Sequence, residues 1–365
     1  MRRRSSAFRG FEEMERRLNL SVSVAVDNGD LLVTGEADGD VVITATAAET
    51  FAVTDNGVLI DTLTGVTDDI RVDIDDSATV ADNNLTVDLA DQSVDDILID
   101  LDDGTNSATV TATTGTAENV HFHGGSDDDS FTLAAGVAVE GVFVRLGGGD
   151  NSATIDGAVE RSLMVTGFDG DDAVSIGAGA TVGRNVELKL GDGDNQLTVA
   201  GAIDGNLRMR GGEDDDTVDL LAGTQIARSV SLSLGDGTNA LTDAAIIDGY
   251  LSYDGRDGND TVALTAEATV AEDVNIRLGD GDNSVTHAGA IAGDITIVSK
   301  NADDVVDVAA GTVDGETTLG LGEQEGNGRG HGHGHGHGRF EDSFAGGGRS
   351  GRGGGFASSG RGRRG

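Results

Sequence analysis

The stretch from Leu190 to Leu220 decides the fold: LGDGDNQLTVAGAIDGNLRMRGGEDDDTVDL. Its opening phrase, LGDGDN, has relatives that begin at Leu101, Leu146, Leu234, Leu278 and Leu321, at intervals of 43 to 45 residues. A unit of this length cannot bury its own apolar face, so units repeated at a constant interval stack on one another. The sequence therefore predicts a solenoid.

Each long unit contains two shorter ones, which are marked by the residue that closes every acidic turn. These closing residues lie 21 to 23 positions apart, and most alternate between Asn and Asp. A coil of about 22 residues with short alternating segments is typical of a parallel β-helix, in which each circuit rises by about 4.8 Å. The closing residues are Asn106, Asp129, Asn151, Asp172, Asn195, Asp216, Asn239, Asp260, Asn283 and Asp304.

The segments between the turns have the pattern of strands. Leu197 and Val199 alternate with polar residues, as do Leu207 and Met209, and the chain contains no proline to interrupt a ladder. We therefore expect an all-β, single-domain parallel β-helix over residues 21–320, with about 12 or 13 coils. Crossover chirality favours a right-handed helix.

Charge and composition restrict the possible partners. The chain carries a net charge of −41, and residues 21–320 contain 11 basic and 58 acidic residues. Such a body attracts divalent cations and basic partners and repels nucleic acid. Aromatic residues make up only 3% of the chain, which argues against a carbohydrate-binding platform, and no cysteine is present for a disulfide or thiolate metal site. No apolar run is long enough for a membrane span.

The acidic turns are of two alternating kinds. One kind has the form G-x-G-[DT]-N in most copies, as in Gly191 to Asn195, and the other includes GGSDDDSF from Gly124 and GGEDDDTV from Gly211. The second kind resembles the calcium-binding repeat of RTX proteins, G-G-x-G-x-D-x-[LIV]-x. This resemblance covers the local turn alone, because the motif recurs every 44 residues and not every nine. It implies that the metal-binding aspartate falls on Asp129, Asp172, Asp216, Asp260 and Asp304.

Stacking of the turns favours cations for a second reason. Carboxylates in a column about 4.8 Å apart repel by roughly 1 kcal/mol per pair even in bulk water, and hard oxygen ligands suit calcium. We therefore expect calcium at this edge, with Asp150, Asp194 and Asp282 as further ligands. The alternative is that Asp, Asn and Gly form solvated turns with no defined site.

The two ends differ from the repeat region. Phe11 to Ser21, FEEMERRLNLS, is similar to the N-terminal sorting segment of large planctomycete surface and extracellular proteins. The resemblance implies export, whereas the alternative is a helical cap formed by residues 1–20. Residues 321–365 form a tail rich in Gly, Arg and His that we expect to be disordered.

The repeating acids argue against an enzyme, because a catalytic centre needs a group that breaks the pattern. Asp243 and His287 break it, since they stand where related coils have aliphatic residues, and we expect them to end strands. His121 and His123 are expected to be surface strand residues. Four further residues depart from the repeat and would line a surface patch near Asp243 and His287: Tyr250, Tyr253, Arg256 and Lys300.

The sequence thus predicts a non-enzymatic, calcium-binding structural or adhesive protein of the cell surface or exterior, whose partners are divalent cations and surface polysaccharides or proteins. Two alternatives stay open. One is a carbohydrate-active enzyme on the same scaffold, and the other is a polyanion or nucleic-acid binder that uses the Arg-Gly tail.

Overall fold

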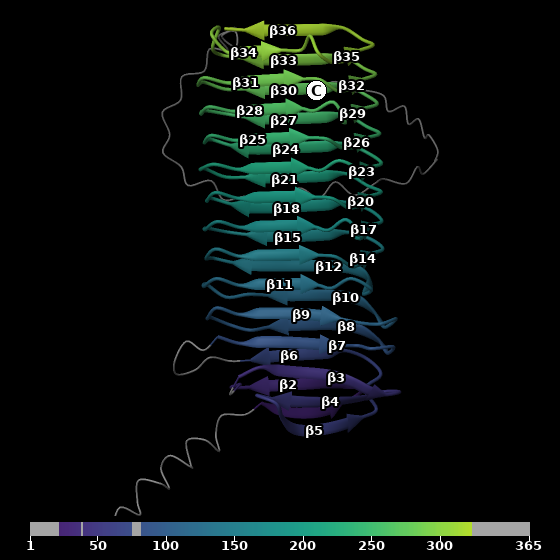
Figure 1. The fold of residues 1–365 in the computed structure, drawn as a ribbon. Coiled ribbons are helices and arrows are strands. Elements are labelled where there is room, and N and C mark those ends of the chain that lie inside the picture. The colour runs from purple at the N-terminus through teal and green to yellow at the C-terminus, as the bar shows by residue number, and fades with distance from the viewer. Residues whose placement is uncertain (1–21, 38, 75–81, 323–365) are drawn as a thin grey trace, which may run out of the picture. The chain divides into compact units, whose positions relative to one another are not determined.

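The computed structural model describes residues 22–37, 39–74 and 82–322. The expected N-terminal helix and the Gly-Arg-His tail lie outside these residues. Within them the chain forms strands and turns, and the strands stack coil upon coil (Figure 1). The expected all-β parallel solenoid is confirmed.

One coil shows the plan of all the regular coils. The chain runs through β13 (Ser152–Ile155), turns at Gly157 into β14 (Ala158–Val159), and turns again into β15 (Leu163–Gly167). An acidic turn then leads to β16 (Ala173–Ile176), which pairs in parallel with β13. Each coil therefore has two long sides and one short side.

The first long side is a 14-stranded sheet, here called sheet B. Its central strands are four residues long, and each has a turn before and after it. Besides β13 and β16 it comprises β3 (Val41–Ala47), β4 (Thr50–Asp55), β5 (Val58–Thr64), β7 (Asn84–Asp88), β9 (Ser107–Thr111), β11 (Ser130–Leu133), β19 (Gln196–Val199), β22 (Thr217–Leu220), β25 (Ala240–Asp243), β28 (Thr261–Leu264), β31 (Ser284–His287) and β34 (Val305–Asp307).

The second long side belongs to a 22-stranded sheet, here called sheet A. Its long strands, besides β15, are β1 (Ser23–Asp27), β2 (Asp30–Gly35), β6 (Ile70–Ile74), β8 (Ser93–Asp100), β10 (Thr116–His123), β12 (Ala138–Gly147), β18 (Val186–Gly191), β21 (Leu207–Gly211), β24 (Val230–Gly235), β27 (Leu251–Gly255), β30 (Val274–Leu278), β33 (Ile295–Ser299) and β36 (Thr317–Leu321).

The short side of the coils is formed by two-residue strands that also belong to sheet A. They pair in parallel with one another and place one aliphatic side chain per coil in the interior, such as Val182 and Ile203. Besides β14 they are β17 (Thr181–Val182), β20 (Ala202–Ile203), β23 (Gln225–Ile226), β26 (Ile246–Ile247), β29 (Thr269–Val270), β32 (Ala290–Ile291) and β35 (Thr312–Val313).

Register is kept from coil to coil, so equivalent side chains form columns. Val174 of β16 pairs with Leu197 of β19, which pairs with Val218 of β22, and all three are buried. Leu207 and Met209 are likewise buried in sheet A, as the alternation of the sequence predicted. Burial of these aliphatic columns is the main favourable contribution to the stability of the fold.

The N-terminal region departs from the coil plan. β1 pairs antiparallel with β2, and β3, β4 and β5 form an antiparallel meander. The turns at Asn28-Gly29 and Asn56-Gly57 have positive φ at both residues, as a tight hairpin between strands of natural twist requires. Because these hairpins take up residues of the expected first coils, the solenoid has about 11 turns and not 12 or 13.

Candidate cation-binding edge of the solenoid

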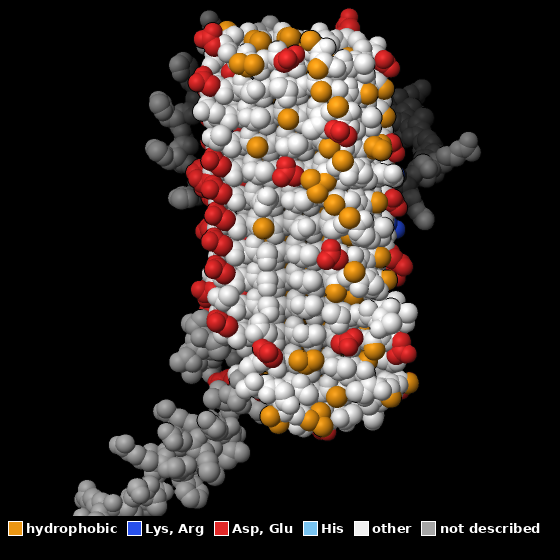
Figure 2. All heavy atoms as spheres, in the orientation of Figure 1, with side chains coloured by type: hydrophobic (Ala, Val, Ile, Leu, Met, Phe, Trp, Pro, Cys, Tyr) orange, Lys and Arg blue, Asp and Glu red, His pale blue; other side chains and the backbone are white. Residues whose placement is uncertain are grey.

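All the acidic turns lie along one edge of the solenoid. Each joins the end of a long sheet A strand to the start of a sheet B strand, as residues 168–172 join β15 to β16. Figure 2 shows acidic side chains in a column along an edge of the molecule. The turns therefore stack as the sequence predicted, and their carboxylates fall into an inner and an outer set.

The inner set consists of the residues that close the turns, and their side chains point into the solenoid. Each accepts a hydrogen bond from the backbone N–H of the closing residue in the preceding coil. The Asn106 N–H donates to Asp129 Oδ1 over 2.9 Å, the Asp129 N–H to Asn151 Oδ1 over 2.7 Å, and the Asn151 N–H to Asp172 Oδ1 over 3.2 Å. The series continues without a break from Asn83 to Asp304. We call this series the inner ladder.

Asparagine and aspartate use their second side-chain atom differently within the inner ladder. Asn195 Nδ2 donates to the carbonyl oxygens of Gly191 and Gly193, at 3.1 and 3.0 Å, and so satisfies the turn that it closes. Aspartate has no such donor when ionised. Of the aspartates, Asp129 Oδ2 accepts from the Gly125 N–H at 2.9 Å, whereas Asp172 Oδ2 and Asp216 Oδ2 are buried without a hydrogen-bond partner among the described residues.

Burial dominates the electrostatics of the inner aspartates. It raises the pKa of Asp129, Asp172 and Asp260 to about 6 and that of Asp216 to about 7, against the smaller opposite effect of the hydrogen bonds from the Asn of the preceding coil. Desolvation disfavours the charged form of a carboxyl group. Asp129, Asp172, Asp216 and Asp260 are thus weaker acids than exposed aspartates.

The last aspartate of the inner ladder has a different neighbour. Gly124, Gly167, Gly211 and Gly255 end or follow the sheet A strand in earlier coils, and a Cβ built on any of them would overlap Oδ2 of the inner aspartate. Ser299 occupies this place in the last copy, and its hydroxyl donates to Asp304 Oδ2. The serine supplies the donor that glycine cannot.

The outer set consists of the residues that directly precede the closing ones, and these are exposed. Their Oδ1 atoms accept from the backbone of the following coil: the Asp150 N–H donates to Asp128 Oδ1 over 2.8 Å, and the Asp171 N–H donates to Asp150 Oδ1 over 2.9 Å. Asp171 and Asp194 accept in the same way from Asp194 and Asp215, at 2.7 and 3.0 Å. Asp128, Asp150, Asp171, Asp194 and Asp215 are therefore carboxylates on five successive coils, which we call the outer ladder.

The structure separates the eight residues predicted to ligate metal. Asp129, Asp172, Asp216, Asp260 and Asp304 belong to the inner ladder, whereas Asp150 and Asp194 belong to the outer ladder. Asp282 lies in the outer position of its own coil, where its N–H donates to Asn259 Oδ1 over 2.8 Å. Metal ligation by these residues stays a prediction, but the two sets offer a cation very different surroundings.

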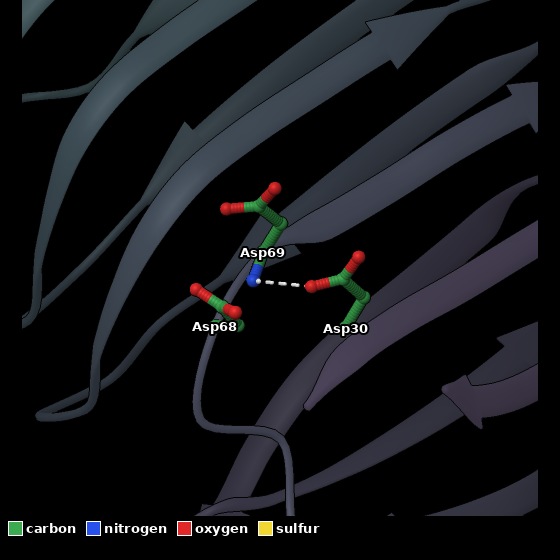
Figure 3. A group of neighbouring side chains, drawn as sticks. All are labelled: Asp30, Asp68 and Asp69. Carbon is green, nitrogen blue, oxygen red and sulfur yellow. Dashed lines mark hydrogen bonds between the residues drawn. The ribbon is translucent and has the colours of Figure 1, made fainter. Parts of the chain in front are cut away.

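Elsewhere in the described residues, three carboxylates converge near the N-terminal hairpins. Asp30, Asp68 and Asp69 place one ligand atom each within 4.8 Å of one another (Figure 3). Arg71 already pairs with Asp30 at 3.0 Å and with Asp69 at 2.6 Å, and the Asp69 N–H donates to Asp30 Oδ1. Arg71 thus offsets one of the three negative charges and occupies oxygens of two of the carboxylates.

The residues that break the repeat are mostly part of the interior. Asp243 and His287 each end a sheet B strand, as expected, and both are buried in the column that also holds Leu220 and Leu264. Burial raises the pKa of Asp243 to about 7. Tyr253 is also buried, so the surface patch considered from Tyr250, Tyr253, Arg256 and Lys300 is not formed as a set.

Sequence reasoning missed a second exposed feature, on sheet A. His121 and His123 are exposed strand residues, as predicted, but they line a groove that also contains the exposed rings of Phe143 and Phe168. A low aromatic content over the whole chain concealed this local concentration of aromatic rings. The signal was present, because Leu98, His121, Phe143 and Met164 follow the same 21-to-23-residue spacing as the closing residues.

Comparison with known proteins adds little to this description. No family model matches the chain, and no curated protein matches it. Among solved structures, a hyperactive, Ca2+-dependent, beta-helical antifreeze protein from an Antarctic bacterium is similar over 69% of this chain and 83% of its own, with 19% identity and a TM-score of 0.35. The calcium dependence is a property of that protein. The fold and the stacked acidic turns together show that the chain is a β-solenoid with one acidic edge.

No helix in the described part of the chain has the length and apolar character needed to cross a membrane.

Proposed function

We propose that the chain is a non-enzymatic structural protein of the cell surface or exterior, whose outer ladder binds divalent cations, calcium above all. One observation carries the proposal: carboxylates occupy the outer position on five successive coils, each joined to the next by a hydrogen bond from the backbone. Calcium favours carboxylate oxygens at the surface of such turns.

The ladder geometry leaves these carboxylates available. Each Oδ1 accepts one backbone N–H, and a carboxylate has acceptor capacity beyond that single bond. Unit charges at the spacing of the coils repel by roughly 1 kcal/mol per neighbouring pair in water. A cation held between successive coils would remove this repulsion and would stabilise the folded state by an amount that grows with the logarithm of the free cation concentration above its Kd.

The proposal assigns the cations to the outer ladder and not to the inner one. Asp172 and Asp216 are buried, their Oδ1 atoms already accept backbone N–H groups, and burial raises their pKa to about 6 and about 7. A carboxyl group that tends to keep its proton is a poor cation ligand. The aspartates at the RTX-like positions would then stabilise the turns by accepting backbone N–H groups and would not bind the cation.

Location outside the cell rests on the N-terminal segment that is similar to planctomycete sorting sequences, together with the strongly acidic solenoid. A structural role rests on the regularity of the acids, which recur with the coil and do not gather into a single reacting group.

The test is thermal unfolding of the full chain, followed by circular dichroism in chelator, calcium or magnesium at constant ionic strength. We expect calcium to raise the melting temperature by several degrees, since a ligand at about 100 times its Kd contributes about 2.7 kcal/mol and each kcal/mol is worth about 2–4 °C in a protein of this size. The triple variant Asp150→Asn, Asp171→Asn and Asp194→Asn should lose most of this shift. Asparagine keeps Oδ1, so the ladder hydrogen bonds survive.

A matched control removes three charges from turns at the opposite end of the long sheet A strands, where β21, β30 and β33 begin. Its substitutions are Asp204→Asn, Asp273→Asn and Asp294→Asn. All three are exposed, and Asp273 and Asp294 also accept backbone N–H groups of following coils, at 2.9 and 2.7 Å. An equal loss of the calcium shift in this control, or no calcium shift in the parent protein, would refute an outer-ladder site.

A further inference from the structure

The exposed face of sheet A carries a groove of about 720 Å³ on the strands β6, β8, β10, β12 and β15. It lies toward the N-terminal part of the solenoid, where Phe143 and Met164 stand at an outward position that Glu187 and Arg208 occupy in the next coils. Phe143 is 37% exposed and Phe168 is 46% exposed. Exposed aromatic rings gathered in one concave place mark a binding site more often than they serve the fold.

The groove contains an apolar column that runs along the solenoid axis. Leu98, His121, Phe143 and Met164 occupy the same outward position on four successive coils. The rings of His121 and Phe143 stack, with centroids 4.8 Å apart and planes inclined by 13°. Because the two parallel rings stack on each other at the coil spacing, they turn C–H edges toward the groove, and these edges offer an apolar surface to a ligand.

A polar column runs beside the apolar one, two residues further along each strand. Asp100, His123, Arg145 and Thr166 occupy it in register. His123 Nδ1 lies 3.3 Å from Asp100 Oδ1, and the guanidinium carbon of Arg145 lies 5.2 Å from the centroid of the Phe168 ring. Among the described residues no carboxylate forms an ion pair with Arg145, whose guanidinium lies over the Phe168 ring in the groove.

The polar column continues as a line of cations beyond the groove. Thr166 pairs with Lys189 of β18, and Lys189 pairs with Arg210 of β21, at the same outward position. Residues 21–320 contain only 11 basic residues against 58 acidic ones. Arg145, Lys189 and Arg210 therefore stand in one line on a strongly negative body, with Lys189 also paired to Glu187 at 3.2 Å.

We propose that this groove binds an acidic polysaccharide, with the sugar chain lying along the solenoid axis. The apolar C–H faces of the sugar rings pack against the edges of the His121 and Phe143 rings, and carboxylate groups of the sugar pair with Arg145 and the cations that follow it. Hydroxyl groups of the sugar donate to Asp100 and bond to His123. The apolar column then contacts the C–H face of a uronic acid ring, and the polar column contacts its carboxylate and hydroxyl groups.

A single-stranded nucleic acid also combines flat rings with negative charge, but the groove suits it less well. Asp100 lies in the polar column, where it would repel a phosphate and accept a hydrogen bond from a sugar hydroxyl. Phosphates also form the denser charge and depend on many cations at once, whereas residues 21–320 contain 58 acidic residues and only 11 basic ones. Binding of a nucleic acid is therefore an outcome of the test and not the proposal.

The groove does not depend on the proposed calcium function, because its lining side chains, apart from Phe168 at the start of a turn, stand on the face of sheet A, whereas the outer ladder lies at the turns. The two are tested separately if chelator is present throughout. Chelator also prevents calcium from cross-linking the polysaccharide probe.

The test measures binding of the full chain to de-esterified polygalacturonate oligomers by isothermal titration calorimetry, in chelator and at about 0.15 M salt, where distant charges are screened. Dextran serves as the uncharged probe and oligothymidylate as the nucleic-acid probe. We expect binding to polygalacturonate, no binding to dextran and weaker binding to oligothymidylate.

Two variants locate the site. Arg145→Gln and Phe143→Ala should each weaken binding by on the order of tenfold, as expected for a buried contact of a charged or aromatic side chain in a complex. Arg277→Gln is the matched control: this arginine is exposed at the same outward position of sheet A, on β30, and lies outside the groove. It should change the affinity by less than about twofold.

Three outcomes would overturn the proposal. Failure to bind polygalacturonate would do so, and so would tighter binding of oligothymidylate. Equal affinity of both groove variants and the parent protein would place the ligand on another part of the chain, such as the Arg-rich tail. Because both substituted side chains are exposed, the melting temperature of each variant should stay close to that of the parent, which keeps a loss of binding distinct from a loss of folding.

Discussion

Asp171 and Asp172 are neighbours in the sequence, yet they belong to different parts of the molecule. Asp171 is exposed in the outer ladder and accepts the N–H of the following coil, whereas Asp172 is buried in the inner ladder and accepts the N–H of the preceding coil. The two ladders thus run in opposite directions through the same turns. Because successive side chains of an extended backbone point to opposite sides, a shift of one residue decides whether a carboxylate is buried and hydrogen-bonded within the turns or exposed to solvent and cations.

The largest effect should come from the glycine that makes room for an inner aspartate. A Cβ on Gly211 would overlap Asp216 Oδ2 and crowd the Leu234 carbonyl, so Gly211→Ala should cost about 3 kcal/mol of unfolding free energy, as overpacking of a rigid interior does. Thermal and urea unfolding measure the loss. Gly179→Ala is the control, because nothing lies within 4 Å of a Cβ at that position; a comparable loss there would mean that the inner ladder imposes no special constraint.

An intermediate effect should follow from removing an inner charge. Burial raises the pKa of Asp216 from 3.8 to about 7 in the folded chain, so the folded state binds more protons than the unfolded state between these values. Proton binding by Asp216 therefore contributes fully to the free energy of unfolding below pH 4, and this contribution is lost as the pH rises through 7. Asp216→Asn should therefore stabilise the protein by about 2 kcal/mol at pH 8 and by little at pH 4.

The matching substitution in the outer ladder sharpens this comparison. Asp215→Asn changes the preceding residue, which is exposed, and should not reproduce the difference between pH 4 and pH 8. Melting temperatures of the two variants across this range decide the matter: parallel pH profiles would contradict the distinction between inner and outer carboxylates.

The smallest effect concerns salt. Repulsion along the outer ladder is screened as the ionic strength rises, so sodium chloride alone should raise the melting temperature of the parent protein in chelator. The variant with Asp150→Asn, Asp171→Asn and Asp194→Asn should start higher at low salt and respond less, by about 1 kcal/mol or less per pair. An identical salt response in both proteins would show that the outer carboxylates do not interact.

Much of the fold could be predicted because the solenoid repeats its own chemistry. The constant spacing of the closing residues, the alternation at Leu197 and Val199 and the absence of proline together predicted parallel coils with all acidic turns at one edge. The inner position of Asp172 was also within reach, because Asp172 and Val174 lie two residues apart and therefore face the same side. The resemblance to a calcium-binding turn obscured this alternation.

Other features needed the three-dimensional structure. The hairpins at Asn28-Gly29 and Asn56-Gly57 carry a recognisable turn signal, but the expectation of uniform coils concealed it. The aromatic groove depends on side chains about 22 residues apart, which meet only when strands such as β10 and β12 are placed in register. Composition averages over the chain and cannot report such a local gathering.

The direction of the inner ladder has a consequence for how the chain is completed during synthesis. The Asn151 N–H donates to Asp172 of the next coil, and Asp150 accepts the N–H of Asp171 of that same coil. A chain that grows from its N-terminus therefore carries one unfinished turn at its advancing end, and each new coil closes the one before it. During synthesis, the last coil to form therefore lacks the acceptor for its inner N–H and the donor for its outer carboxylate until the next coil is in place.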